Sequence, residues 1–393
     1  MGMRVVGLTS LLALLGLGLI SCGSSSDVSA GTGLLYVTTQ GNTSVSAWAI
    51  DLSTGAITTN NNATATGNKA TSIVFTPSGD AAFVANSQDN TVSTFTVNTD
   101  GTLATTSNTQ PTGTTPLALS MDPGGKFLFV ANQGTFNQIQ SGSISVFSVS
   151  GSQLTEVSGS PFSTALPTDV SGSGPASVAI SPNGQYLYVA NQFSNTVEAF
   201  AVDSSGALIL PGTVYPVGTA PSAVTFSPDG NFIFVTNQGT NNISAFAACT
   251  NATLNCVTPD GHLTPVAGSP FSANGLGPVA MAVESDSQGE YLYVANFNSN
   301  QISQFKVGVS SGVLSALSPN AISTGSNPTS VVVRAGSSTL LSTGGTTYYV
   351  FATNITSGTI SSFSYDSTTG LLTQVGSGTP ITTAGLPSAL AVR

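Results

Sequence analysis

Apolar and polar positions along the chain follow a unit of short strands, seen most clearly in residues 175–200. An apolar run at 176–180 leads through a Pro-Asn-Gly turn into a second run at 185–190, whose two faces are both apolar. A strand buried on both faces needs a neighbouring sheet on each side. An alternating run at 196–202 and a last run at 207–210 complete the unit. The pattern predicts a four-stranded antiparallel sheet of about fifty residues.

The unit recurs seven times. Its second run ends in Tyr/Phe-Val-Ala/Thr-Asn, with a degenerate first copy at 36–39 and the asparagines at Asn86, Asn132, Asn191, Asn237, Asn296 and Asn354. The spacing averages about 52 residues, close to that of four-stranded propeller blades. Each third run carries an aromatic residue, namely Trp48, Phe95, Phe147, Phe200, Phe246, Phe305 and Phe363. Seven aligned aromatic residues disfavour the alternative of unrelated strands in a sandwich.

The two ends of the repeat region complement each other. The first copy begins at its second strand, Leu34–Val37, and the chain finishes with a lone first strand, Pro387–Arg393. We therefore expect an all-β fold, a seven-bladed β-propeller of four-stranded antiparallel blades. The C-terminal strand should pair into the N-terminal blade, which closes the ring and removes exposed sheet edges.

The N-terminal residues predict export. An apolar run from Val5 to Ile20 follows Arg4, is shorter than the ~20 residues that span a bilayer, and ends in Leu-Ile-Ser-Cys22. This ending resembles the lipobox of bacterial lipoproteins. We expect residues 1–21 to be a signal peptide, Cys22 to carry a lipid, residues 22–33 to be a flexible tether and residues 34–393 to form the propeller. The protein would lie in the bacterial cell envelope, on the periplasmic or cell-surface side of a membrane.

Composition restricts the partners. Charged residues make up 6 % of the chain and the net charge is −10, so the surface should not attract nucleic acid. We expect a monomer, held at the membrane by its lipid, with a glycan or an envelope protein as ligand. Nothing in the sequence indicates a cofactor or a metal site.

Two cysteines besides Cys22 enclose a short loop. Cys249 and Cys256 lie between the third and fourth strands of the fifth copy, a spacing that suits a disulfide in an oxidising compartment. A metal or redox pair is the alternative.

In a propeller, the links between blades and the second-to-third-strand turns emerge on the same face. That face should carry the six repeated asparagines, an insertion in the third copy (133–142) and Lys69, which lies in a link. We expect a ligand there, with the asparagines and Lys69 as candidate contacts. The alternative role for the asparagines is to cap the turns at the strand ends.

The repeat Pro-Ser-x-Val, Ser-Pro-Asp-Gly, Phe-Val-x-Asn of Pro221–Asn237 resembles the YVTN-type repeat. It is similar to the seven-bladed lactonase family that includes the 6-phosphogluconolactonases, and the similarity covers roughly residues 34–393. It implies hydrolysis of a sugar lactone on one face, with Arg, His and acidic side chains binding the substrate and moving protons.

No cluster of Arg and His can be placed on the link-bearing face. Lys126 and Arg334 flank first-to-second-strand connections on the opposite face, Arg393 ends the chain, and His262 opens an outermost strand. The acidic stretch 284–290 is interpreted as a solvated hairpin. We therefore expect no catalytic residue and favour a binding or scaffold module of the envelope, with a lactone hydrolase as the alternative.

Overall fold

The computed structural model describes residues 32–58, 63–138, 141–164, 172–251, 256, 258–336, 347–376 and 380–393, without the side chains of residues 106–108. The predicted signal peptide, Cys22 and most of the tether lie outside this part, so the proposed division of the N-terminal segment stays a prediction. Within the described residues there is no apolar helix of membrane-spanning length.

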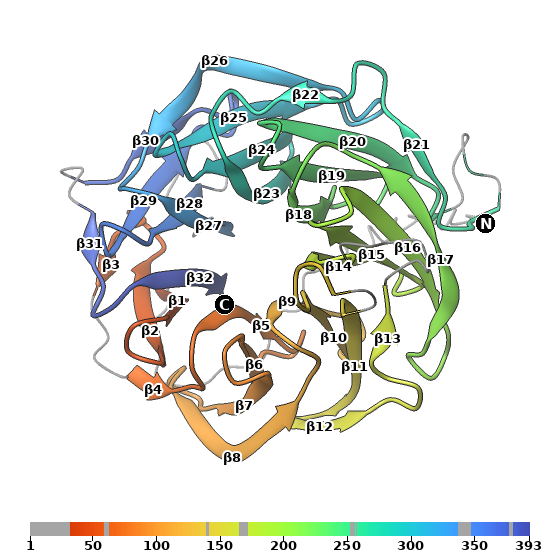
Figure 1. The fold of residues 1–393 in the computed structure, drawn as a ribbon. Helices are drawn as coiled ribbons and strands as arrows, with labels where there is room; N and C mark the ends of the chain where they lie inside the picture. The colour runs from red at the N-terminus through yellow and green to blue at the C-terminus, as the bar shows by residue number, and fades with distance from the viewer. Residues whose placement is uncertain are drawn as a thin grey trace, which may run out of the picture.

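Seven antiparallel sheets stand around a common axis like the blades of a fan (Figure 1). This confirms the predicted seven-bladed β-propeller. We number the blades from the N-terminus: blade 1 contains β1–β4 and β32, blade 2 β5–β8, blade 3 β9–β13, blade 4 β14–β17, blade 5 β18–β22, blade 6 β23–β26 and blade 7 β27–β31.

The first strand of each blade lies nearest the axis, and the second strand lies beside it. The first strands are β32 (Pro387–Val392), β5 (Ala70–Phe75), β9 (Pro116–Met121), β14 (Pro175–Ile180), β18 (Pro221–Phe226), β23 (Pro278–Asp286) and β27 (Pro328–Ala335). The second strands are β1 (Thr32–Thr39), β6 (Ala81–Asn86), β10 (Phe127–Asn132), β15 (Tyr186–Asn191), β19 (Phe232–Asn237), β24 (Gly289–Asn296) and β28 (Tyr348–Asn354).

The third and outer strands complete each blade. The third strands are β2 (Ser44–Asp51), β7 (Thr91–Val97), β11 (Ser143–Ser150), β16 (Thr196–Val202), β20 (Asn242–Ala248), β25 (Gln301–Val307) and β29 (Thr359–Tyr365). Three blades have one long outer strand, β8 (Leu103–Pro111), β17 (Leu208–Pro216) or β26 (Leu314–Ser323). In the other four the outer edge consists of two short strands: β3 (Ile57–Thr58) and β4 (Ala63–Ala65), β12 (Gln153–Glu156) and β13 (Phe162–Ser163), β21 (Leu263–Pro265) and β22 (Phe271–Ser272), β30 (Leu372–Gln374) and β31 (Ile381–Thr382).

The ring is closed by the last strand of the chain. β32 pairs antiparallel with β1, from Leu35 opposite Val392 to Thr39 opposite Pro387. The ladder extends one step further, because Leu34 and Arg393 exchange both backbone hydrogen bonds, at 3.1 and 2.9 Å. Blade 1 therefore joins the two ends of the described chain, as predicted.

The core is divided into seven clusters, one at each interface between neighbouring blades. Each third-strand aromatic residue belongs to the cluster that faces the preceding blade of the ring. For Trp48 of blade 1 that neighbour is blade 7, which closes the ring. All seven rings are nearly inaccessible to solvent. The repeated aromatic position is thus explained by packing between blades, where most of the apolar burial occurs.

Hydroxyl groups of the first strands join neighbouring blades around the axis. In four blades the second residue of the strand donates a hydrogen bond to the carbonyl of the residue that opens the next first strand. In the Pro-Ser-x-Val motif, Ser222 donates to the carbonyl of Pro278 at 2.8 Å. The serine of the motif therefore stabilises the ring itself.

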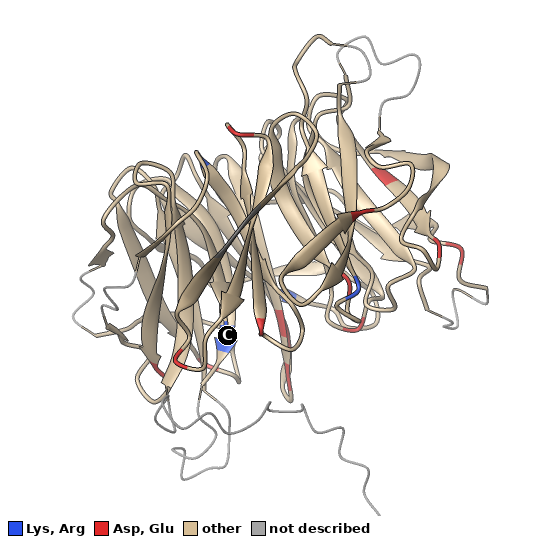
Figure 2. Ribbon diagram, turned by 90° about the horizontal axis from the view of Figure 1, so that it is seen from below, with Lys and Arg blue, Asp and Glu red and all other residues tan. Residues whose placement is uncertain are grey.

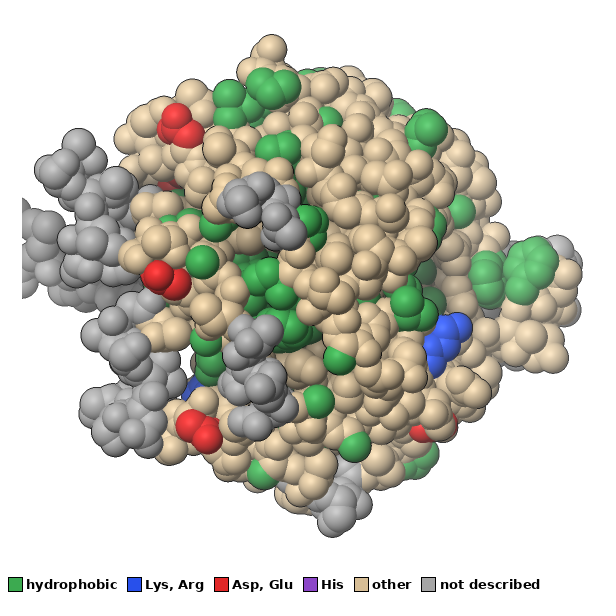
Figure 3. Space-filling model, turned by 90° about the vertical axis from the view of Figure 1, so that its left-hand side faces the viewer, with side chains coloured by type: hydrophobic (Ala, Val, Ile, Leu, Met, Phe, Trp, Pro, Cys, Tyr) green, Lys and Arg blue, Asp and Glu red, His purple; other side chains and the backbone are tan. Residues whose placement is uncertain are grey.

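Two faces follow from this topology. The link face carries the links between blades and the second-to-third-strand turns, and the turn face carries the first-to-second and third-to-fourth connections. The outer wall between them shows a few isolated charges on a largely uncharged surface (Figure 3).

Candidate functional site

The six repeated asparagines on the link face are enclosed within their blades. Asn86, Asn132, Asn237, Asn296 and Asn354 are fully buried and Asn191 is 1 % exposed. In each case Nδ2 donates a hydrogen bond to a side chain of the third strand, a hydroxyl in five blades and a carboxylate in blade 4. The partner is seven residues further on, except that Asn132 donates to Ser145, because blade 3 carries the insertion between these strands. This burial leaves almost no surface for a ligand to contact, so we assign these side chains a role in holding the second and third strands together.

A second set of asparagines joins the links to the turns of the preceding blade. Asn90, Asn195, Asn241 and Asn300 have positive φ angles, and each accepts a hydrogen bond of 2.7–2.8 Å from the backbone N–H of the next link. Lys69 also has a positive φ, and its side chain is exposed. The described part of the link face is therefore a hydrogen-bonded lattice with few ionisable groups.

Charged residues gather instead on the turn face, along the lower edge of the ribbon in Figure 2. Arg334, Arg393 and Lys126 lie at this face, at the ends of β27, β32 and the turn before β10. The acidic residues there are Asp51, Asp80, Asp100, Asp122, Asp203, Asp229, Asp260, Glu284, Asp286, Glu290 and Asp366.

One position in each blade, six residues after the start of the first strand, marks the turn-face end of the strands around the axis. In blades 2 to 5 this position is Thr76, Asp122, Ser181 or Ser227. There the side-chain oxygen accepts a hydrogen bond, 2.6–3.1 Å long, from the backbone N–H five residues later. These four side chains are occupied in shaping the turn.

In blades 6, 7 and 1 the same position is Glu284, Arg334 or Arg393, which we call the charged arc. Here the backbone continues its ladder instead of turning: Glu284 pairs with Tyr291, and Arg334 pairs with Tyr349. The three side chains are therefore not needed for a turn. The arc places one carboxylate and two guanidinium groups on neighbouring strands around the axis.

Burial changes the pKa values of two residues of the charged arc, Glu284 and Arg334. Burial raises the pKa of Glu284, an effect that the nearby charge of Asp286 reinforces. Burial lowers the pKa of Arg334, and its Nε has no hydrogen-bond partner. A carboxylate with a raised pKa is a stronger base than a free one, and a partly desolvated guanidinium can bind an oxyanion.

Beside Glu284 lies a cluster of tyrosines between blades 6 and 7. Tyr348 stacks on Tyr365 with ring centroids 4.8 Å apart and planes inclined by 20°. The hydroxyl of Tyr365 donates a hydrogen bond of 2.8 Å to Oδ2 of Asp286. Burial raises the pKa of Tyr348, and the charges of Glu284 and Asp286 raise it further.

A cavity of about 670 Å³ lies elsewhere on the turn face, between the outer parts of blades 5 and 6. Its lining includes Phe232, Val266, Val309, His262 and both cysteines, but no carboxylate and no lysine or arginine. His262 is exposed, and its Nδ1 lies 3.0 Å from the hydroxyl of Tyr215. The cavity therefore lacks the acid and base pair that the charged arc provides.

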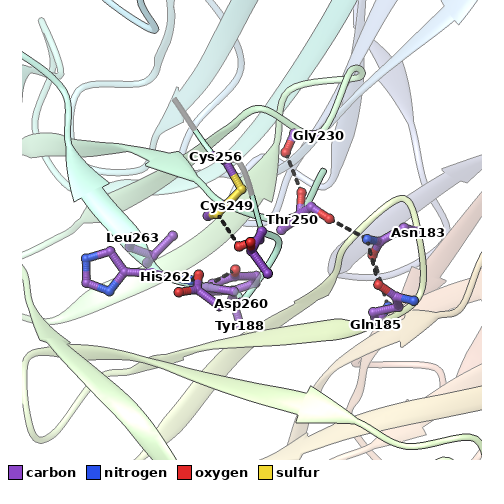
Figure 4. Close-up of a disulfide and its surroundings, with 12 residues drawn as sticks. Asn183, Gln185, Tyr188, Gly230, Cys249, Thr250, Cys256, Asp260, His262 and Leu263 are labelled. Atoms are coloured by element: carbon purple, nitrogen blue, oxygen red, sulfur yellow. Dashed lines mark hydrogen bonds between the residues drawn. A yellow bond between two sulfur atoms is a disulfide. The ribbon is translucent and has the colours of Figure 1, made fainter. Parts of the chain in front are cut away.

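The cysteines at the rim of this cavity form a disulfide, with Cα atoms 5.2 Å apart. Figure 4 shows it beside the connection from β20 to β21, where Cys249 Sγ also lies 3.4 Å from the carbonyl of Thr258. Nearby, Asn183 of blade 4 donates a hydrogen bond to the carbonyl of Thr250, which ties this connection to the neighbouring blade. The position indicates a structural role.

The sequence analysis correctly assigned Arg334 and Lys126 to the turn face, but it expected the ligand on the link face. The sequence does contain a signal for the charged arc. Three successive copies lack the Ser-Pro-x-Gly turn and have a charged residue in place of its Ser. The stretch 284–290 forms a hairpin whose residues Ser285, Ser287 and Gln288 are exposed, but Glu290 is only 3 % exposed. Its side chain is enclosed between blades 5 and 6.

Fold and site together define a closed seven-bladed propeller with acidic and basic groups at one end of its innermost strands. The family described as lactonase, 7-bladed beta-propeller, matches residues 27–158 and 140–255, more than half of the chain. The protein therefore belongs to that lactonase family. No protein with a curated description matches the sequence.

Solved structures agree on the fold. A periplasmic gluconolactonase from Pseudomonas aeruginosa superimposes with a TM-score of 0.71 and 21 % identity, covering 92 % of this chain and 99 % of that one. A candidate 6-phosphogluconolactonase from Bacteroides uniformis has a TM-score of 0.69 and 19 % identity, covering 93 % and 100 %. Another from Bacteroides fragilis has a TM-score of 0.68 and 20 % identity, covering 94 % and 100 %.

The family match corrects the preferred interpretation of the sequence. A binding or scaffold module was favoured over a lactone hydrolase because no catalytic groups could be placed on the link face. That preference was wrong: the family and the similar structures support the lactonase alternative. The physical reason is that the expectation considered the link face, whereas most of the charged residues lie on the turn face.

Proposed function

We propose that this protein hydrolyses a sugar lactone at the charged arc. The proposal rests on Glu284, Arg334 and Arg393, three charged residues in a chain of the lactonase family. Their backbones continue the strand ladder at a position where blades 2 to 5 form a turn. Blades 2 to 5 use the same position for turn hydrogen bonds, so the three charges are not explained by the repeat.

Lactone hydrolysis needs the groups that the arc contains. A water molecule attacks the carbonyl carbon, and a base must take its proton, a role that suits Glu284. The carbonyl oxygen becomes an oxyanion, which Arg334 can stabilise. The ring C–O bond then breaks, and its oxygen takes up the proton. The product is a hydroxy acid whose carboxylate the second arginine, Arg393, can bind.

We further propose that the reaction takes place in the periplasm or at the cell envelope. The predicted signal peptide supports this location, as does the Cys249–Cys256 disulfide, which persists in oxidising compartments. The similar gluconolactonase from Pseudomonas aeruginosa is described as periplasmic. Lipid attachment at Cys22 remains part of the proposal.

Purified protein without residues 1–29 tests the activity. Proton release from D-glucono-1,5-lactone is followed in weak buffer and compared with spontaneous hydrolysis. The proposal expects a saturable acceleration that is proportional to protein concentration. Rates equal to those in buffer alone, for both five- and six-membered aldonolactones, would overturn it.

A further inference from the structure

The tyrosine cluster next to the charged arc has the form of a sugar-binding surface. We propose that Tyr348, with Asp286 beside it, holds the sugar ring of the lactone while Glu284 faces the reacting carbonyl. The inference rests on the proposed lactonase function and adds the residues that select an uncharged sugar ring.

Tyr348 is held rigidly from one side. It opens β28, is half-buried and stacks on Tyr365 at 4.8 Å. Tyr365 is itself 3 % exposed and packs against Tyr291 and Tyr293, with centroids 5.8 and 5.9 Å away. A ring fixed in this way loses little conformational freedom when a ligand packs on it.

The chemistry of the cluster matches a polyhydroxylated ring. The C–H bonds on one face of a pyranose carry partial positive charge and pack on the negative face of an aromatic ring. Asp286 is fixed by its hydrogen bond from the Tyr365 hydroxyl and by the backbone N–H groups of Gln288 and Gly289. Ionised carboxylates only accept hydrogen bonds, so they require the donors that sugar hydroxyls supply.

Connectivity places this surface next to the arc. Glu284 and Asp286 both belong to β23, and their charges act on the Tyr348 phenol. Tyr349, the residue after Tyr348, is the partner of Arg334 in the ladder between β27 and β28. Tyr348 therefore lies on the strand that pairs with the strand of Arg334, and both strands pack beside blade 6, which carries Glu284.

The test uses Tyr348→Leu, with Tyr348→Phe and Tyr186→Leu as controls. Tyr186 opens β15 as Tyr348 opens β28 and is equally half-buried, but it belongs to blade 4. Two quantities are measured: the KM and kcat for D-glucono-1,5-lactone, and the calorimetric Kd for D-glucono-1,5-lactam, which resists hydrolysis. Melting temperatures verify that each variant is folded.

Tyr348→Leu should raise both the KM and the lactam Kd about tenfold, with kcat changed less than about threefold. The other two variants should bind like the wild type. Unchanged lactam affinity in a folded Tyr348→Leu variant would overturn the subsite while leaving the lactonase proposal intact. Lactam binding that depends on Tyr348, without any turnover, would support the subsite and overturn the lactonase. A wild type that does not bind lactam would overturn the subsite directly.

The two carboxylates also predict selectivity. A phosphate on the sugar would be repelled by Glu284 and Asp286, so the 6-phosphorylated lactone should react with about tenfold lower kcat/KM. Asp286→Asn should reduce this discrimination. Equal kcat/KM for the two lactones would overturn the assignment of an uncharged ring.

Discussion

The hydroxyl of Ser388 donates a hydrogen bond of 2.6 Å to the carbonyl of Ala70, 318 residues earlier in the chain. Ser388 lies in the strand that closes blade 1, and Ala70 opens the first strand of blade 2. The same hydroxyl lies 2.9 Å from Thr38 Oγ1 in β1. One serine thus connects the last strand to its own blade and to the next one.

Ser388→Ala should therefore weaken ring closure. It leaves the buried Ala70 carbonyl without this donor, which should lower the free energy of unfolding by about 1–3 kcal/mol. Urea unfolding followed by tyrosine fluorescence measures the change, and Ser326→Ala, at an exposed position of a link, is the control. Equal stability of the two variants would show that the hydroxyl does not hold the ring together.

Asn237→Ala tests the role of the asparagine repeat. Its Nδ2 donates hydrogen bonds to Asn242 Oδ1 at 2.7 Å and to Ser244 Oγ at 3.0 Å, and the residue is fully buried. We expect a loss of about 1–3 kcal/mol in unfolding free energy, with the KM for lactone unchanged. A variant of normal stability that binds lactone more weakly would point to ligand contact instead.

Glu290 predicts a pH dependence of stability. Burial raises its pKa to about 7, and the charge of Asp229 adds to the effect. Because the folded-state pKa lies above the unfolded-state value, the stability is complete below pH 4.5 and is lost as pH rises towards and through 7. The loss amounts to at most about 3 kcal/mol. Melting temperatures should therefore fall between pH 5 and 8 in the wild type and change less in Glu290→Gln. If the melting temperatures of the two proteins changed in parallel with pH, the raised pKa of the buried Glu290 carboxylate would be contradicted.

Removal of the disulfide should affect stability but not catalysis. Replacing Cys249 and Cys256 by serine frees a short loop, which should cost about 2 kcal/mol of unfolding free energy. Both cysteines line the cavity between the outer parts of blades 5 and 6, away from the strands that carry the charged arc. Thermal unfolding and lactone turnover of the double variant measure the two effects. A large fall in kcat at full stability would place the loop in the active site.

The fold could be predicted because the repeat encodes it many times over. Each second strand is apolar on both faces, each third strand carries one aromatic residue, and these positions are the ones buried between blades. The closing strand was also predictable, since Pro387–Arg393 is a first strand without a second one after it.

The site could not be predicted in the same way, because it lies where the repeat is broken. Glu284, Arg334 and Arg393 stand at the ends of three successive first strands, β23, β27 and β32, which lie side by side around the axis. Their ability to act depends on burial, which changes the pKa of Glu284 and Arg334 and which a repeat pattern does not reveal. Arg393 in particular looks like a chain end in the sequence, whereas the structure places it in a strand ladder next to Leu34.

The most direct test of the central claim is the kcat/KM for D-glucono-1,5-lactone in Glu284→Gln and Arg334→Gln, with Lys126→Gln as control. Lys126 is an exposed cation of the same face outside the arc. Both arc variants should keep the wild-type melting temperature and lose about a hundredfold or more in kcat/KM, whereas Lys126→Gln should match the wild type. Full activity in either folded arc variant would contradict the assignment of lactone hydrolysis to the charged arc.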